Sequence, residues 1–409
     1  MTTAPPGWRR TTLGELGRYL NGRAFKKSEW APDGRPIIRI QNLTGSNLTY
    51  NHFRGDVEDR YVVRSGDLLV SWAATLGAYV WTGQEAVLNQ HIFKVESNID
   101  VRFHKHLLDH KLSELRRHTH GSGMVHITRG RFDSLPAAVP PLAEQCRIVD
   151  VLEDHLSRLG AAESYLLAAR GRAKVMVKAV LLEMIPEVSD YPSHWESTVV
   201  GEAGMVGLGR QRHPDWHTGP TMRSYLRVAN VFEDRIDISD LKQMHWPDKT
   251  FERFRLHLGD VLLNEGQTPE LLGRPAIYRG IPADVAFTNT LIRFKVREDV
   301  LPEFALLVFR RHMHAGRFTR ESRITTNIAH LSAARLKTIE FPVPPLAEQA
   351  SFVARAAEQF EAIDRLEAAA RVASARGSQL RKALLAAAFS GQLTGRESDM
   401  DRVEEMALT

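Results

Sequence analysis

The side chains of this chain that could do chemistry are polar and basic residues on predicted loops, and they form no catalytic constellation. The 409 residues contain neither a Gly-x-x-x-x-Gly-Lys-Ser/Thr phosphate loop nor a His-Glu-x-x-His metal motif. The segment Gly22–Ser28 lacks the second glycine and the Gly-Lys pair of a phosphate loop. The single cysteine, Cys146, rules out an internal disulfide and a cysteine zinc cluster. The sequence therefore predicts a protein with no catalytic residues, no bound metal and no cofactor.

The polar loop residues suit contacts with DNA instead. Arginine, asparagine, glutamine and threonine can read base edges, while lysine and arginine contact phosphates. For the first half of the chain the predicted DNA-contacting residues are Arg23, Lys26, Lys27, Arg39, Asn42, Gln90 and His91. For the second half they are Arg210, Arg212, Arg227, Asn230, Gln267, Asn289, Arg320, Arg323, Thr325 and Asn327. The alternative for each of them is a turn-forming, capping or solvated role.

Charge and composition are compatible with such a partner but do not identify it. The net charge is +5 and the isoelectric point is about 9.3, which favours an anionic partner only weakly in so long a chain. One cysteine fits a reducing compartment. The first ten residues contain no apolar segment typical of a secretory signal, and no apolar stretch is long enough to span a bilayer. We therefore expect a cytoplasmic protein without a membrane anchor.

The elements that position these residues come in two copies. The hexapeptide Pro-Pro-Leu-Ala-Glu-Gln occurs at Pro140–Gln145 and again at Pro344–Gln349. Each copy introduces about five heptads with mostly apolar a and d positions, which predicts two long coiled-coil helices. The predicted helix–helix seam consists of Ile148, Leu152, Leu159, Leu166 and Met176 in the first helix and Phe352, Ile363, Leu366, Leu380 and Leu384 in the second. Because these seams need partners, we expect the two helices to pair with each other.

A mixed segment precedes each helix, and the two segments share a framework. Trp8–Glu15 resembles Trp195–Glu202, Ile38–Leu43 resembles Leu226–Val231, and Gly66–Val70 resembles Gly259–Leu263. These short β-rich pieces are followed by helical segments, which predicts α+β modules. The predicted fold is thus two similar α+β target-recognition modules and two long antiparallel helices, with pseudo-two-fold symmetry. The predicted boundaries are 1–139, 140–188 (helix), 189–342, 343–395 (helix) and a flexible tail over 396–409.

Between these matching frameworks the polar loops differ. Ser71–Gly77 has little in common with Asn264–Glu270, and His118–Thr128 differs from Arg320–His330. A shared framework with different loops is expected of two readers of different targets. Ordinary drift after duplication is the alternative. The histidines His118, His120 and His126 could bind a metal, although incidental histidines of a solvated loop are the favoured interpretation.

This arrangement resembles the specificity subunit of bacterial type I restriction–modification enzymes over essentially the whole chain. The resemblance rests on the two Val-Pro-Pro-Leu-Ala-Glu-Gln segments, on Gly66–Trp72, on Leu88–Val95 and on Phe389–Leu393. It implies two modules that each read one half of a split site in double-stranded DNA, with the helices as a spacer. It also implies two DNA methyltransferase subunits that supply the S-adenosylmethionine chemistry, and an ATP-driven restriction subunit that can join them.

The expected function is therefore that of a non-catalytic subunit that reads a bipartite DNA site and directs methyltransferase and restriction subunits to it. A coiled-coil scaffold for protein partners, without DNA specificity, is the alternative, and a nuclease is a third. If the helices pair within one chain, the second must run back so that Leu393 lies close to the first module.

Overall fold

A computed structural model describes residues 4–73, 75–118, 128–325, 328–393 and 398–408. The chain divides into two compact units. Unit 1 consists of residues 1–166 and 372–409, and unit 2 consists of residues 167–371. Each unit therefore contains one globular module and parts of both long helices, so the boundaries between units fall within the helices. The predicted scheme treated those helices as separate segments.

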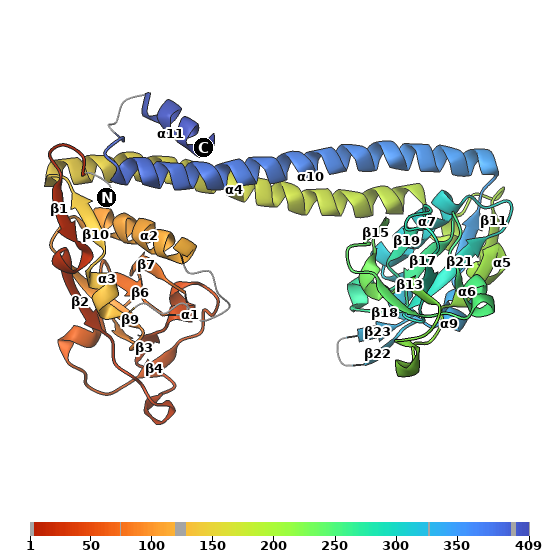
Figure 1. Cartoon of the computed structure of the whole chain (residues 1–409), viewed down its shortest axis with the longest axis horizontal. Helices are drawn as coiled ribbons and strands as arrows, with labels where there is room; N and C mark the ends of the chain where they lie inside the picture. Colours follow the sequence, from red (N-terminus) through yellow and green to blue (C-terminus); the bar gives the residue numbers. More distant parts are fainter. Residues whose placement is uncertain (1–3, 74, 119–127, 326–327, 394–397, 409) are drawn as a thin grey trace. The chain divides into compact units, whose positions relative to one another are not determined.

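The module of unit 1 is built on two four-stranded sheets (Figure 1). The first is antiparallel, in the order β2 (Gly17–Asn21), β9 (Ile92–Ser97), β6 (Leu68–Ser71) and β7 (Gly77–Val80). The second has the order β4 (Asn51–Phe53), β3 (Arg35–Ile38), β8 (Ala86–Leu88) and β5 (Val62–Val63). Helix α2 (Val101–His118) contributes Phe103, Leu107, Leu108 and Leu112 to the core. A short ribbon, β1 (Arg9–Thr12) with β10 (Pro136–Val139), joins the two ends of the module.

Unit 2 repeats this plan. Its first sheet has the order β12 (Gly204–Leu208), β21 (Leu291–Val296), β17 (Val261–Asn264) and β19 (Pro275–Ile277). Its second sheet contains β16 (Lys242–His245), β13 (Met222–Leu226) and β20 (Ala286–Phe287). Strands β9 and β21 have the same pattern of buried and exposed positions along their six residues. Helix α7 (Pro302–His314) takes the place of α2, and β11 (Glu196–Val199) pairs with β24 (Glu340–Val343) as β1 does with β10. The predicted α+β class and the internal repeat are confirmed.

Unit 2 also contains a two-stranded sheet of β14 (Val231–Phe232) and β15 (Arg235–Ile236), and an additional three-stranded sheet. One shared segment differs from its predicted structure. Strands β18 (Gly266–Gln267), β23 (Ile328–His330) and β22 (Arg323–Thr325) form a three-stranded sheet from the loops that differ between the halves. The segment Ile38–Leu43 was expected to be β-rich, yet the strand ends at Ile38 and α1 (Ile40–Leu43) follows. The strand ends there because an asparagine side chain caps the next turn, as described below.

Two long helices, α4 (Leu142–Met184) and α10 (Leu346–Phe389), pack against each other within each unit. In unit 1 the start of α4, with Ile148 and Leu152, shares a core with Leu384 and Ala388 near the end of α10. In unit 2 the end of α4, around Leu181, shares a core with Phe352 and Ala356 near the start of α10. The helices are therefore antiparallel in both units, as predicted.

The predicted seam is wrong at two positions. Ile148, Leu152, Ile363 and Leu384 are buried, and Leu159, Leu166, Phe352 and Leu380 are half-buried. Met176 is 47% exposed and Leu366 is 59% exposed. A straight α-helix drifts by about 20° per heptad from a strict seven-residue repeat, so fixed heptad positions leave the seam after several heptads. Beside Met176 the covered side chains are Ala173 and Val177, and beside Leu366 they are Ile363 and Glu367, so the covered positions step by four at both places.

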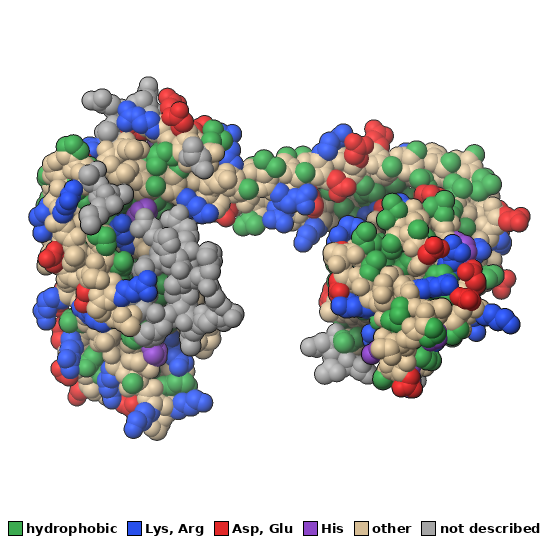
Figure 2. Space-filling model, viewed as in Figure 1, with side chains coloured by type: hydrophobic (Ala, Val, Ile, Leu, Met, Phe, Trp, Pro, Cys, Tyr) green, Lys and Arg blue, Asp and Glu red, His purple; other side chains and the backbone are tan. Residues whose placement is uncertain are grey.

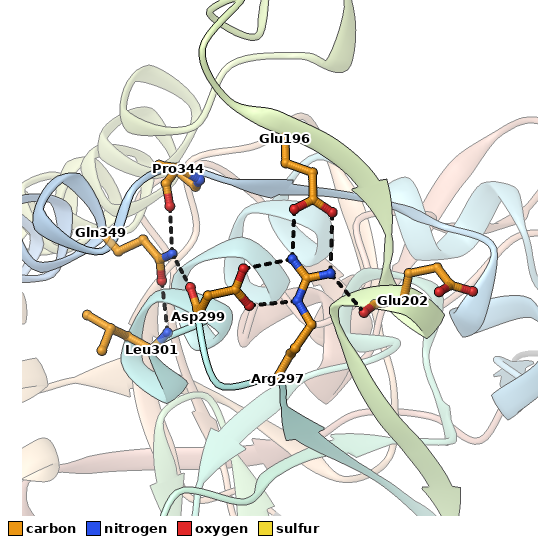
Figure 3. Close-up of polar contacts among 7 residues, drawn as sticks. All are labelled: Glu196, Glu202, Arg297, Asp299, Leu301, Pro344 and Gln349. Atoms are coloured by element: carbon orange, nitrogen blue, oxygen red, sulfur yellow. Dashed lines mark hydrogen bonds and ion pairs between the residues drawn. The ribbon is translucent and has the colours of Figure 1, made fainter.

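The repeated hexapeptide clamps each helix to its module. The side chain of Gln145 donates a hydrogen bond to Pro140 O (2.8 Å) and accepts one from Asp100 N (2.9 Å). Gln349 does the same at the equivalent place, with bonds of 2.8 Å from its Nε2 to Pro344 O and Asp299 O and a bond of 2.8 Å from Leu301 N to its Oε1 (Figure 3). The preceding glutamates accept from tryptophan indoles, Trp8 to Glu144 (3.3 Å) and Trp195 to Glu348 (2.9 Å). The hexapeptide therefore has a structural role in both units.

In unit 2 an arginine extends this clamp to the ribbon. Arg297 binds both carboxylate oxygens of Asp299 (2.6 and 2.9 Å) and both of Glu196 (3.3 and 2.7 Å) (Figure 3). It also donates to Glu202 O at 3.4 Å. Since Asp299 accepts from Gln349, one network connects β11, the end of β21 and the start of α10.

The end of α10 returns to the first module, as predicted. Leu393 is buried in the core of unit 1, and Arg147 donates to its carbonyl at 3.4 Å. The expectation of a flexible tail over 396–409 is wrong for the described part. Residues Ser398–Leu408 form helix α11, and Val403 is fully buried in the core of unit 1. The apolar residues Met400, Val403, Met406 and Ala407 recur at helical spacing, which explains why this segment folds. No helix in the described part of the chain is long and apolar enough to cross a membrane.

Candidate nucleic-acid interface

Some of the predicted DNA-contacting residues of each half lie around one turn, which is built the same way in both units. In unit 1 Arg23 N donates to Leu88 O (2.8 Å), and Asn89 N donates to Ile38 O (3.1 Å). These bonds hold Arg23, Gln90 and the start of α1 at the β8–β9 turn. In unit 2 Arg210 N donates to Phe287 O (3.2 Å), and Thr288 N donates to Leu226 O (3.1 Å). The turn between β20 and β21 thus brings Arg210, Arg227 and Asn289 together.

A glycine permits the close chain approach in both turns. A Cβ atom at Gly22 would lie 2.2 Å from Asn89 O and 2.4 Å from Leu88 O. At Gly209 it would lie 2.3 Å from Thr288 O. Backbone atoms cannot yield as a flexible side chain would, so both positions require glycine. Neither glycine was among the predicted site residues, although each stands directly before a predicted arginine.

The guanidinium groups of Arg23 and Arg210 contact side chains of their own units, although Nη1 of Arg23 is buried with no hydrogen-bond partner among the described residues. Arg23 forms an ion pair with Glu29 and lies over the rings of Phe25 (4.9 Å) and Phe53 (5.2 Å). Arg210 is buried between Trp216 and Trp246, at 3.8 and 4.9 Å from their ring centres, and donates to His245 O at 2.8 Å. Burial lowers the pKa of Arg210. Both arginines support the turn, and we do not retain them as phosphate contacts.

Asn42 and Asn230 also have structural roles. The Asn42 amide accepts from Arg39 N (3.0 Å) and donates to Asn47 O (3.0 Å) and Thr49 O (3.1 Å). The Asn230 amide accepts from Arg227 N (3.1 Å) and donates to Asp237 O (2.9 Å) and Asp240 O (3.2 Å). Each side chain is buried with its bonding capacity used, so it holds the loop that follows the strand. We leave both out of the proposed DNA-contacting set.

The other predicted residues of unit 1 remain accessible. Lys26 and Lys27 are exposed at the start of a short 3₁₀ turn. The guanidinium of Arg39 lies 5.2 Å from the ring centre of Trp30. Gln90 contacts the exposed His91, whose ring nitrogen lies 3.3 Å from the Gln90 amide nitrogen. The Gln90 amide oxygen is buried and has no hydrogen-bond partner among the described residues.

Several of the predicted DNA-contacting residues of unit 2 belong to the additional sheet rather than to the β20–β21 turn. Arg212 and Arg320 are exposed, and Asn289 and Gln267 are half-buried. Arg227 forms an ion pair with Asp240 at 2.5 Å. Gln267 lies on β18 and Arg323 and Thr325 on β22, in the additional sheet. The side chains of Arg323 and Thr325, and Asn327 as a whole, lie outside the described residues, as do the side chain of His118 and all of His120 and His126.

Ion pairs reduce the basic character of the surface. On the face drawn in Figure 2, lysine and arginine side chains lie among aspartate and glutamate side chains in both units. Examples are Arg54 with Asp33 and Arg223 with Asp248 (2.7 Å). Within the described ranges no group of three or more His, Cys, Asp or Glu side chains could hold a metal ion. The surface can hold a polyanion through a few exposed cations and hydrogen-bonding side chains on two supported turns.

The chain is similar in sequence to known proteins. Residues 5–164 match a family model described as the type I restriction modification DNA specificity domain. The chain is 25% identical to the type I restriction enzyme EcoBI specificity subunit of Escherichia coli, over 95% of this chain and 87% of the relative. It is 20% identical to the MjaVIII specificity subunit of Methanocaldococcus jannaschii, over 88% of this chain and 87% of the relative.

Solved structures share the fold along nearly the whole chain. A chain from a type I R-M system, solved to describe complex assembly and conformational transition, has a TM-score of 0.77 at 18% identity and covers 96% of this chain and 100% of its own. The HsdS subunit from Thermoanaerobacter tengcongensis has a TM-score of 0.53 at 19% identity, covering 96% and 98%. The long helices and both modules are part of these matches.

Proposed function

Because the chain belongs to the family of type I restriction–modification specificity subunits, we propose that it reads a bipartite site in double-stranded DNA, one half-site with each module. Sequence-specific DNA recognition is the role that the family implies. The assignment of one half-site to each module is our inference from the repeat.

One observation carries this proposal. Both units build the same turn from equivalent backbone bonds, a required glycine and a capping asparagine. The accessible side chains around the two turns are nevertheless different: lysines, Gln90 and His91 in unit 1, against Arg212, Asn289 and the additional sheet in unit 2. A fixed frame with variable polar groups supports recognition of two different sequences.

The partners follow from the same family membership. We propose that two DNA methyltransferase subunits assemble with this chain and supply the S-adenosylmethionine chemistry, and that an ATP-dependent restriction subunit can join them. The chain itself acts as the non-catalytic subunit that directs this chemistry to its site. The support is the assembly named for the similar R-M structure and the specificity subunits among the relatives.

Module exchange tests the proposal. Residues 195–340 are replaced by the equivalent module of a relative, and methylated sites are mapped in host DNA that carries the methyltransferase subunit. We expect one half-site to change while the other half-site stays the same. A change in both half-sites would refute the assignment of one half to each module. Loss of all sequence preference, with protein partners still bound, would favour the scaffold alternative.

A second experiment addresses the exposed lysines. Replacing Lys26 and Lys27 with alanine should weaken binding to all duplexes about equally, and the slope of log K against log salt should fall by about one for each phosphate that is no longer neutralised. Arg18, an exposed cation paired with Glu96 at 2.8 Å, provides the matched control, and its alanine variant should keep the full salt slope. If the slope of the lysine variant is unchanged in gel-shift titrations, these lysines do not contact phosphates.

A further inference from the structure

Glu265 lies beside the β20–β21 turn of unit 2, directly after strand β17. Its backbone N–H donates to Thr290 O in the turn (3.0 Å), and Leu331 N donates to its carbonyl oxygen (2.8 Å). The last residue of β23, His330, places its Nδ1 atom 3.3 Å from both carboxylate oxygens of Glu265. Glu265 therefore joins the turn to the additional sheet, whose strands β18, β22 and β23 lie side by side (Figure 1).

The internal repeat places a different side chain at the same point of unit 1. Strands β6 and β17 pair with β9 and β21 in the same register, so Trp72, directly after β6, is the counterpart of Glu265. Trp72 N donates to His91 O (3.5 Å), as Glu265 N does to Thr290 O. The Trp72 ring stacks on Phe93 with 5.6 Å between the ring centres. Unit 1 therefore has an aromatic ring where unit 2 has a carboxylate.

The carboxylate of Glu265 is accessible and held in place. The side chain of Glu265 is 27% exposed and that of His330 is 47% exposed. Because a carboxylate only accepts hydrogen bonds, the contact between them requires a proton on Nδ1 of His330. A Cβ atom at Gly266 would lie 3.1 Å from this Nδ1, so the glycine leaves room for the ring. One donor does not use the four lone pairs of a carboxylate, and its oxygens can accept another hydrogen bond.

The bases differ in what they offer such a group in the major groove. Cytosine presents the N4 amino group, which donates, whereas guanine presents the N7 and O6 acceptors and thymine presents the O4 acceptor and a methyl group. Adenine presents an amino donor next to the N7 acceptor, a pair that suits the amide of glutamine or asparagine. A carboxylate therefore matches cytosine, and it rejects guanine and thymine because acceptors then face each other.

We propose that Glu265 is a specificity-determining residue of unit 2, which selects a cytosine in its half-site by accepting a hydrogen bond from the N4 amino group. His330 is the positioning residue that holds the carboxylate. Unit 1 cannot make this selection at the equivalent point, because Trp72 presents no carboxylate there. This inference rests on the proposed function, since it names a base that one module reads.

Selection from duplexes with randomised half-sites tests the proposal, using the full chain assembled with a methyltransferase subunit. Module exchange identifies the half-site that residues 195–340 read, and the wild-type protein should require a cytosine there. Glu265→Gln keeps the shape of the side chain and can still accept from His330. The preferred base at this position should change from cytosine to adenine on the same strand, by roughly fivefold to a hundredfold, while the other half-site stays the same.

Matched variants separate base selection from a structural role. His330→Ala should reduce the preference for cytosine without creating one for adenine, because the carboxylate is no longer held. His330→Asn should restore much of the preference, because its amide can donate from near the position of Nδ1. Glu270 is exposed on the next turn, η7 (Pro269–Leu271), so Glu270→Gln is the control and should leave every base preference unchanged.

A modified base tests the same contact without a protein variant. Pyrimidin-2-one takes the place of cytosine in a duplex but has no amino group at position 4. Replacing the selected cytosine with it should lower the affinity of the wild-type protein at least about fivefold in gel-shift titrations, and should affect Glu265→Gln much less. The same replacement of a cytosine in the gap between the half-sites is the control and should change nothing.

Each outcome decides the inference. It is overturned if the wild-type half-site of unit 2 contains no selected cytosine, or if pyrimidin-2-one binds as well as cytosine. It is also overturned if Glu265→Gln lowers affinity without changing the preferred base, because Glu265 then has a structural role only. If the wild-type protein prefers no base in either half-site, the proposed function itself fails, so the two failures are distinguishable.

Discussion

Replacing Gln349 with leucine should destabilise unit 2 through the loss of three hydrogen bonds. Gln349 is fully buried. Its side-chain amide donates hydrogen bonds to Pro344 O and Asp299 O and accepts one from Leu301 N, each 2.8 Å long (Figure 3). Leucine is similar in size and creates little cavity. The change therefore tests the polar contacts rather than packing volume.

The magnitude follows from these contacts. Leaving the three backbone partners of Gln349 unpaired costs about 2 kcal/mol each, or about 6 kcal/mol together. Burial of the apolar leucine side chain stabilises the folded state by about 1.5–3 kcal/mol. We expect a net loss of about 3 kcal/mol in the free energy of unfolding of unit 2. Gln349→Glu should be at least as damaging, because a carboxylate oxygen then faces the carbonyl oxygens of Pro344 and Asp299.

The assay combines urea unfolding with amide hydrogen exchange. Exchange at the Leu301 amide should accelerate in Gln349→Leu, because its acceptor is removed. Gln359→Leu is the matched control: it lies on the same helix, is exposed, and should change stability by less than about 0.5 kcal/mol. If Gln349→Leu is as stable to urea as the wild-type protein, and its Leu301 amide exchanges at the wild-type rate, this role for Gln349 is refuted.

Three further predictions concern other parts of the chain. Adding one heptad to both α4 and α10 lengthens them by about 10 Å, so methylation mapping should show a gap between half-sites longer by about three base pairs; an unchanged gap would show that the helices do not set the spacing. Gly22→Ala should distort the β8–β9 turn and lower DNA affinity with the helices intact, whereas Gly130→Ala, where a Cβ meets nothing within 4 Å, should be neutral in the same titration. Burial lowers the pKa of His104 to about 4, so the unfolded chain binds a proton at a higher pH than the folded chain. The free energy of unfolding should therefore reach its full value above about pH 6.5 and be about 2 kcal/mol lower at pH 5. His104→Gln should remove this part of the pH dependence in urea titrations. An equal dependence of the free energy of unfolding on pH in both proteins would contradict the assignment.

Local patterns in the sequence determined the elements and their repetition. The duplicated hexapeptide predicted two long helices, because proline starts a helix well and apolar residues at heptad spacing require a partner. The paired segments around Trp8 and Trp195 predicted two modules with the same strands. The direction of the second helix followed as well, since one chain can pair its own seams only if that helix runs back.

Tertiary structure decided the roles of individual side chains. Asn42 and Arg210 are residue types expected in DNA contacts. The Asn42 amide instead donates to Asn47 O in the loop that follows, and Arg210 donates to His245 O and lies against the ring of Trp246, both distant in the sequence. Met176 fits a heptad, yet the accumulated drift of a 3.6-residue helix turns it outward. The tail beyond residue 396 has an acidic composition typical of a solvated segment, but Val403 finds an apolar pocket that only the folded helix pair provides. Sequence spacing specifies what neighbours along the chain can do, whereas the partners of a side chain depend on contacts that form only when distant segments meet.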